Sequence, residues 1–121
     1  MLNKDGGVKM LTIKALEELG VNTKEGLERC LGKEDFYFKM IGMGINNEHF
    51  EGLKKALERS DLTAAFEDAH ALKGTIGNLA LTPVYTPLAE LTELLRAKQK
   101  EGCKELTDKV FTELEKIKAL L

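Results

Sequence analysis

The sequence of 121 residues contains no tryptophan, only two prolines and only two cysteines. Cys30 and Cys103 lie far apart and match no CxxC or other ligand spacing, so we expect two free thiols rather than a disulfide. No apolar run approaches the roughly 20 residues that a membrane span requires, and the first ten residues lack the apolar core of a signal peptide. These absences predict a cytoplasmic protein.

Charge of one sign is not concentrated anywhere in the chain. The 18 basic and 20 acidic side chains are interspersed and give a formal net charge of −2. Because nucleic acids are bound by a clustered positive field, we do not expect one as the main partner. The hydrophobic fraction of 43% is that of a globular protein. The length predicts a single domain, residues 1–121.

Strand signals are also scarce, whereas apolar residues recur at helical spacing nearly throughout. Residues 1–33 are expected to form a polar lead, which frays over 1–7, and two short accessory helices that end at Gly20 and Gly32. The first of these helices includes Val8. We interpret this part as an appendage laid against the main body.

The main body, residues 34–121, is expected to contain four amphipathic segments joined by short connections. They cover about 34–58 with a break near Asn46, 62–80, 83–100 ended by Gly102, and 103–120. Pro83 and Pro87 leave two possible starts for the third segment. Short loops favour antiparallel neighbours, so the pattern predicts an all-α protein: an antiparallel up-down four-helix bundle with short N-terminal accessory helices.

One stretch within 62–80 is unusual: residues 69–78, with the sequence AHALKGTIGN. At about 100° per residue, Lys73 lies about 60° to one side of His70, Gly74 about 40° to the other side, and Gly77 about 20° away. The ammonium group of the lysine and the two glycines therefore lie on the same face of the helix as the imidazole. The opposite face carries a regular apolar stripe, made of Ala65, Ala69, Leu72, Ile76 and Leu79.

The two glycines on this face call for an explanation other than stability. Each costs about 1 kcal/mol relative to alanine inside an exposed helix. We interpret Gly74 and Gly77 as giving a second protein access to His70. An exposed imidazole is largely neutral near neutral pH and can act as a nucleophile, and Lys73 can hold an anion beside it. Phosphoryl transfer to nitrogen requires little more than this nucleophile, charge neutralisation and access.

Other chemistries have less support in the sequence. Glu67 and His70 form a single Glu-x-x-His, whereas a di-iron bundle uses two such motifs and two further glutamates. The other histidine, His49, is preceded at that spacing by Asn46, and we interpret it as a surface residue. No GxSxG, HExxH or P-loop pattern is present. A purely structural role for His70 remains an alternative at this point.

The segment AHALKGTIGNLALTP resembles the signature of histidine-containing phosphotransfer (HPt) domains, and the likeness covers about 34–121. This resemblance implies a phosphorelay carrier, a phosphoprotein of two-component signalling. His70 would accept a phosphoryl group at Nε2 from the aspartate of one receiver domain and pass it to another. Lys73 would offset the phosphoryl charge, while Gly74 and Gly77 would let the receiver approach. The receiver would hold the catalytic aspartates and Mg²⁺, so the chain itself would need no cofactor or metal and have no kinase activity.

The resemblance further implies response-regulator receiver domains, with a hybrid sensor histidine kinase as another candidate, as partners of a monomer. Residues around the histidine are expected to dock the receiver: Phe66, Glu67, Gly74, Gly77 and Asn78. Phe66 lies about 40° from His70, where it either leans onto a neighbouring helix or joins an apolar docking rim.

Two points stay open at the level of the sequence. Many relatives carry glycine where this chain has Ala80, and we expect the change to affect the end of the helix more than the chemistry. An alternative function is a receiver-binding or scaffolding bundle that carries no phosphate.

Overall fold

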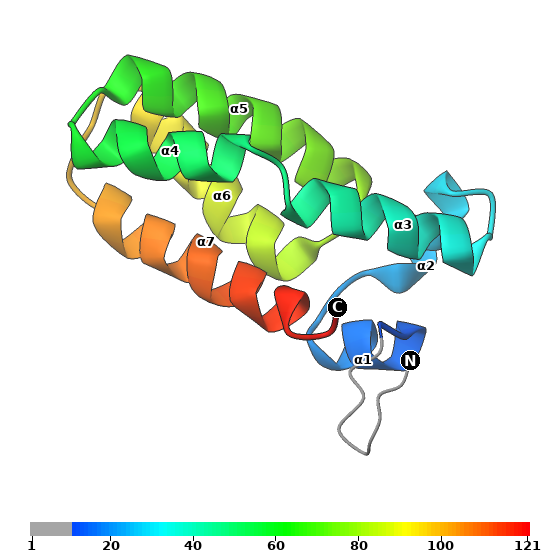
Figure 1. The fold of residues 1–121 in the computed structure, drawn as a ribbon. Helices are drawn as coiled ribbons and strands as arrows, with labels where there is room; N and C mark the ends of the chain where they lie inside the picture. The colour runs from blue at the N-terminus through cyan, green and yellow to red at the C-terminus, as the bar shows by residue number, and fades with distance from the viewer. Residues whose placement is uncertain (1–10) are drawn as a thin grey trace.

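The computed structural model describes residues 11–121 and, within that range, contains helices and no strands (Figure 1). The prediction of an all-helical chain is therefore confirmed for this part. The fraying lead predicted at 1–7, and Val8 in the first helix, fall outside the described residues. The helices in that range are α1 (Ile13–Glu18), α2 (Thr23–Arg29), α3 (Glu34–Ile45), α4 (His49–Glu58), α5 (Leu62–Asn78), α6 (Thr82–Arg96) and α7 (Cys103–Lys118).

The long helices pack side by side around an apolar core. α5 lies between α4 and α6, and α6 also packs against α7. Figure 1 shows α3 and α4 following one another roughly in line, with α3 reaching toward α2 at one end. The apolar stripe predicted for α5 is buried, and it meets fully buried side chains of the other helices, among them Ile41, Leu53, Leu88, Leu91 and Leu114.

The helix breaks follow from local side-chain bonds. The predicted break near Asn46 is confirmed, because α3 ends at Ile45 and α4 begins at His49. The side-chain oxygen of Asn47 accepts a hydrogen bond from the His49 backbone N–H at 2.8 Å. At the start of α5, the Asp61 carboxylate accepts a bond from the third N–H of the helix at 3.0 Å, as a typical N-cap does.

α6 begins at the first of the two candidate prolines and ends earlier than predicted. Pro83 occupies the first turn, and Pro87 lies buried inside the helix. The predicted end near residue 100 is wrong, because the chain turns after Arg96. Lys98 adopts a left-handed backbone with φ of 55°, and the N–H groups of residues 98 and 99 close the last turn. A lysine therefore makes the turn that we assigned to Gly102.

The N-terminal helices hold the end of α5. The hydroxyl of Tyr37, in α3, donates a hydrogen bond of 2.8 Å to the backbone carbonyl of Leu79, and burial raises the pKa of this phenol to about 12. Gly26, in α2, lies so close to the Tyr37 ring that a Cβ there would overlap it. The backbone N–H of Asn22 bonds to the carbonyl of Ala80 at 3.1 Å. α2 and α3 thus fix the C-terminal end of α5.

Both cysteines are buried and free, as the sequence predicts. The thiol of Cys103 donates to the Gln99 carbonyl at 3.1 Å, and its burial, with the nearby Glu105 carboxylate, raises the pKa of the thiol. Such a thiol stays protonated and has little reactivity. Among residues 11–121, no helix is both long and apolar enough to cross a membrane.

Candidate functional site

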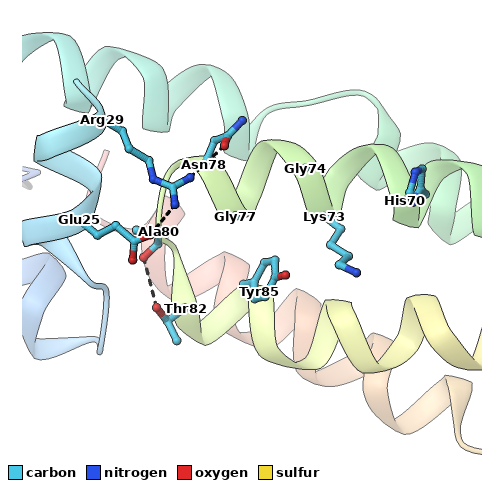
Figure 2. A pocket seen from close by; sticks show the side chains of 10 residues that line it. All are labelled: Glu25, Arg29, His70, Lys73, Gly74, Gly77, Asn78, Ala80, Thr82 and Tyr85. Atoms are coloured by element: carbon cyan, nitrogen blue, oxygen red, sulfur yellow. Dashed lines mark hydrogen bonds and ion pairs between the residues drawn. The ribbon is translucent and has the colours of Figure 1, made fainter. Parts of the chain in front are cut away.

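The unusual face of α5 borders an open groove of about 530 Å³ between helices (Figure 2). Figure 2 shows His70 near one end of the groove and side chains from α2 at the other. Three helices and the turn after α5 contribute to its walls, which are formed by Glu25, Arg29, His70, Lys73, Gly74, Gly77, Asn78, Ala80, Thr82 and Tyr85. The groove therefore brings His70 and Lys73 together with residues of α2 and α6.

His70 and Lys73 lie one helical turn apart and differ in exposure. The imidazole of His70 is exposed, whereas Lys73 is half-buried because its side chain extends toward α6 (Figure 2). Lys73 is therefore less exposed than its place on the same helix face as His70 suggests. Within residues 11–121, its ammonium group has no hydrogen-bond or ion-pair partner. A positive charge without a counter-charge in this part of the chain thus lies one helical turn from an exposed imidazole, which suits the binding of an anion.

The two glycines of this face have different surroundings. A Cβ built on Gly74 would have nothing within 4 Å, so its absence leaves open surface beside His70. A Cβ on Gly77 would lie 3.0 Å from Cε1 of Tyr85, in α6. The close packing of α6 therefore accounts for Gly77. Our interpretation that both glycines lack a structural explanation is wrong for Gly77 and holds for Gly74.

Phe66 lies directly beside the histidine. Its ring stacks on the His70 imidazole with a centroid separation of 5.5 Å and an interplanar angle of 19°. Phe66 is half-buried against the core, and the guanidinium carbon of Arg96, in α6, lies 4.9 Å from its ring centroid. Of the two alternatives raised by the sequence, the ring adopts the first and leans toward a neighbouring helix. A docking role remains a prediction.

α2 contributes a pair of charged side chains to the groove. Arg29 donates a hydrogen bond from Nη1 to Oδ1 of Asn78 at 3.0 Å, and it also pairs with the carboxylate of Glu25 (Figure 2). The interpretation of the N-terminal helices as a mere appendage is therefore incomplete. Arg29 and Asn78 are 49 positions apart in the sequence, and no local pattern indicates that they meet.

The second histidine is more than a surface residue. Nδ1 of His49 lies 2.7 Å from Oδ1 of Asp68, which joins the start of α4 to the middle of α5. The His49 side chain is 43% exposed and that of Asp68 only 21%. Gly52 makes room for this pair, because a Cβ there would lie 2.8 Å from the carboxylate. The two histidines thus have neighbours of opposite charge: His49 has a carboxylate, and His70 has a lysine one turn away.

Ala80 makes the turn that ends α5. It adopts a left-handed backbone with φ of 58°, and its N–H bonds to the carbonyl of Gly77 at 3.0 Å. The next N–H, of Leu81, donates to the carbonyl of Ile76 at 3.3 Å. Together the two hydrogen bonds form a Schellman motif, in which the residue at the position of Ala80 is usually glycine. Alanine pays about 1–2 kcal/mol for this conformation. The departure from the resembling family therefore lies in the turn that ends α5, and its expected effect on the helix end stays a prediction.

Glu67 is exposed on α5 and does not line the groove. Its predicted role in docking therefore has no support from the groove. In the part of the chain that the structure describes, no group of three or more histidine, cysteine, aspartate or glutamate side chains lies close enough to hold a metal ion.

The helical packing defines an all-α protein with an exposed histidine one turn from a lysine that has no partner within residues 11–121. The sequence model of the Hpt domain family matches residues 46–120, which is more than half of the chain, and the chain belongs to this family. The match begins at the break between α3 and α4, later than the likeness we expected from residue 34, and leaves out α1, α2 and α3. A comparison with curated proteins and one with solved structures each found no match.

Membership in this family supports a general role in phosphorelay histidine phosphotransfer. Hpt domains are phosphoryl carriers that exchange the group with response-regulator receiver domains; they have no kinase activity of their own and need no cofactor.

Proposed function

We propose that the chain is a phosphorelay carrier in which His70 accepts a phosphoryl group at Nε2 from the aspartate of one receiver domain and passes it to another. One observation carries the proposal: the exposed imidazole lies one turn from the half-buried ammonium group of Lys73, which has no partner within residues 11–121, at an open groove. Both residues fall inside the range that matches the family. The choice of Nε2 follows the family resemblance.

The proposed step moves the phosphoryl group between an oxygen and a nitrogen. The lone pair of the neutral His70 nitrogen forms the N–P bond while the P–O bond to the receiver's aspartate breaks. The electron pair of the broken bond leaves on the aspartate carboxylate. The other ring nitrogen keeps its proton, so the ring is cationic until that proton passes to water. Transfer to the second receiver reverses these bonds: the other ring nitrogen takes a proton back from water, that receiver's carboxylate attacks phosphorus, and the N–P bond breaks to leave a neutral imidazole.

Lys73 stabilises the charge of the phosphoryl oxygens in this proposal. The transferring group spreads negative charge over its oxygens, and a fixed cation stabilises that charge. The ammonium group has no counter-charge to give up within the described chain, so little is lost when it turns to the phosphoryl group. Mg²⁺ and the catalytic aspartates belong to the receiver.

The receiver domain docks over the open side of the groove. Gly74 lets the receiver approach His70 closely, because nothing lies within 4 Å of the place where a Cβ on Gly74 would be. Asn78 and its partner Arg29 form the far end, so α2 also contributes to the docking surface. Gly77 contributes by seating Tyr85 below the contact surface rather than by clearing space for the partner.

We also propose that the chain acts as a single-domain monomer built on an up-down four-helix bundle. In this arrangement α3 and α4 together form one broken helix, and α5, α6 and α7 form the other three. The packing of α5 on α4 and α6, and of α6 on α7, supports it. α1 and α2 are accessory helices; α2 supports the end of α5 through the bond from Asn22 to the Ala80 carbonyl and through the packing of Gly26 on Tyr37.

Transfer of labelled phosphate from a phosphorylated receiver tests the proposed acceptor. We expect acid-labile label on the wild-type protein and on the matched control His49→Gln, and none on His70→Gln. Label retained on His70→Gln would overturn the assignment. Receiver binding without label on the wild type would favour the alternative, a scaffolding bundle that carries no phosphate.

A further inference from the structure

We propose that Phe66 is a positioning residue that fixes the plane of the His70 imidazole for phosphoryl transfer. The inference rests on the proposed role of His70 and deepens it. It starts from the stacked pair: the two rings lie 5.5 Å apart between centroids and are inclined by only 19°. This geometry falls in the range of favourable offset stacking.

The stack follows from the direction of side chains on a helix. Residues four apart lie on the same face, and side chains tilt toward the N-terminus, so His70 leans back over Phe66. Phe66 is half-buried among core residues, whereas His70 is exposed. The phenyl ring is therefore the fixed member of the pair and the imidazole the mobile one.

α6 holds the phenyl ring from another direction. The guanidinium of Arg96 lies 4.9 Å from the Phe66 centroid, within the range of cation–π attraction. The Arg96 side chain is itself oriented by a bond of 3.3 Å from Nε to the carboxylate of Glu93. Phe66 is thus anchored both by the core and by α6, which makes it a firm support for the histidine.

Such a support can orient the nucleophile without blocking it. The nitrogen lone pair of an imidazole lies in the ring plane, whereas the stack covers a face of the ring. Fixing the plane therefore narrows the directions in which the lone pair points and leaves the ring edge open. In-line attack on phosphorus depends on that direction, and correct orientation of a reacting group accelerates transfer. Phe66 acts through His70 and touches no substrate.

Replacing the ring while keeping an apolar side chain tests the proposal. We expect Phe66→Leu to slow phosphorylation of His70 about three- to tenfold, the loss that corresponds to one aromatic contact. Phe66→Tyr, which keeps the stack, should restore the rate. Phe111→Leu is the matched control, because Phe111 is also a half-buried phenylalanine in an aromatic pair, but with Phe50 and on α7.

An NMR readout separates positioning from stability and from docking. A proton over an aromatic face is shielded, so the ring protons of His70 should shift downfield in Phe66→Leu and stay in place in Phe66→Tyr and Phe111→Leu. Unchanged shifts and an unchanged rate in Phe66→Leu would overturn the proposal. A slower rate explained wholly by weaker receiver binding would also overturn the proposal and would show that Phe66 belongs to an apolar docking rim for the receiver. Absence of label on the wild type would instead reject the role of His70, while the shifts would still report the stack.

Discussion

The two histidines of this chain lie on neighbouring parts of the same bundle, but their surroundings suit opposite purposes. His49 is joined to the Asp68 carboxylate at 2.7 Å and links α4 to α5. His70 is exposed, stacks on a phenyl ring and has one turn away a lysine that is unpaired in the part of the chain that the structure describes. A phosphoryl group would be repelled by the carboxylate at the first site and attracted by the ammonium group at the second. Under the proposed function, the neighbours of each histidine, rather than the imidazole itself, determine which of the two accepts a phosphoryl group.

Among changes to the neighbours of the two histidines, the largest expected effect comes from removing the lysine that distinguishes the His70 site. We expect Lys73→Ala to slow phosphoryl transfer about 10- to 100-fold, because a positioned charge on the transferring group is lost. The free energy of unfolding should change by less than about 1 kcal/mol, since the ammonium group has no bonded partner within residues 11–121. Lys73→Arg, which keeps the charge, should retain much of the rate. Loss of several kcal/mol with normal transfer would make Lys73 a structural residue.

Matched alanine substitutions of the two glycines sharpen the distinction between access and packing. We expect Gly74→Ala to raise the free energy of unfolding by up to about 1 kcal/mol, from helix propensity, but to slow transfer several-fold by obstructing the receiver. Gly77→Ala should destabilise the protein, because Tyr85 has to move. Thermal unfolding and transfer rates measure both effects. If the two variants behaved alike, the assignment of separate roles would fail.

The smallest effect is expected at the other histidine. Asp68→Asn weakens the link between α4 and α5 and should lower the free energy of unfolding by about 0.5–1 kcal/mol, the range of a single partly exposed hydrogen bond. Label on His70 should be unchanged. A large drop in the transfer rate at normal stability would mean that the His49–Asp68 pair takes part in the function.

Features set by neighbouring residues could be predicted from the sequence. The apolar stripe of α5, the placement of Lys73 and Gly74 beside His70, and the break near Asn46 all follow from helical periodicity and side-chain capping. Contacts between distant segments could not be predicted in this way. The bond from Arg29 to Asn78 and the packing of Tyr85 on Gly77 depend on how whole helices approach one another.

The end of α6 was also not predicted, because the residue that makes its final turn is not a glycine. Lys98 takes the left-handed turn that glycine usually makes, so the sequence carried no signal for the early end of α6. The tilt of side chains along a helix indicates that His70 leans over Phe66, but it does not show that the rings are parallel.

Locating the phosphoryl group on one ring nitrogen tests the central claim most directly. The protein is labelled with ¹⁵N in its histidine side chains, phosphorylated by a phospho-receiver and observed by NMR without acid treatment. The proposed function predicts that Nε2 of His70 changes its shift and couples to phosphorus, while both ring nitrogens of His49 stay unchanged. Phosphorus coupling at His49, or none at either histidine while the receiver still binds, would contradict it.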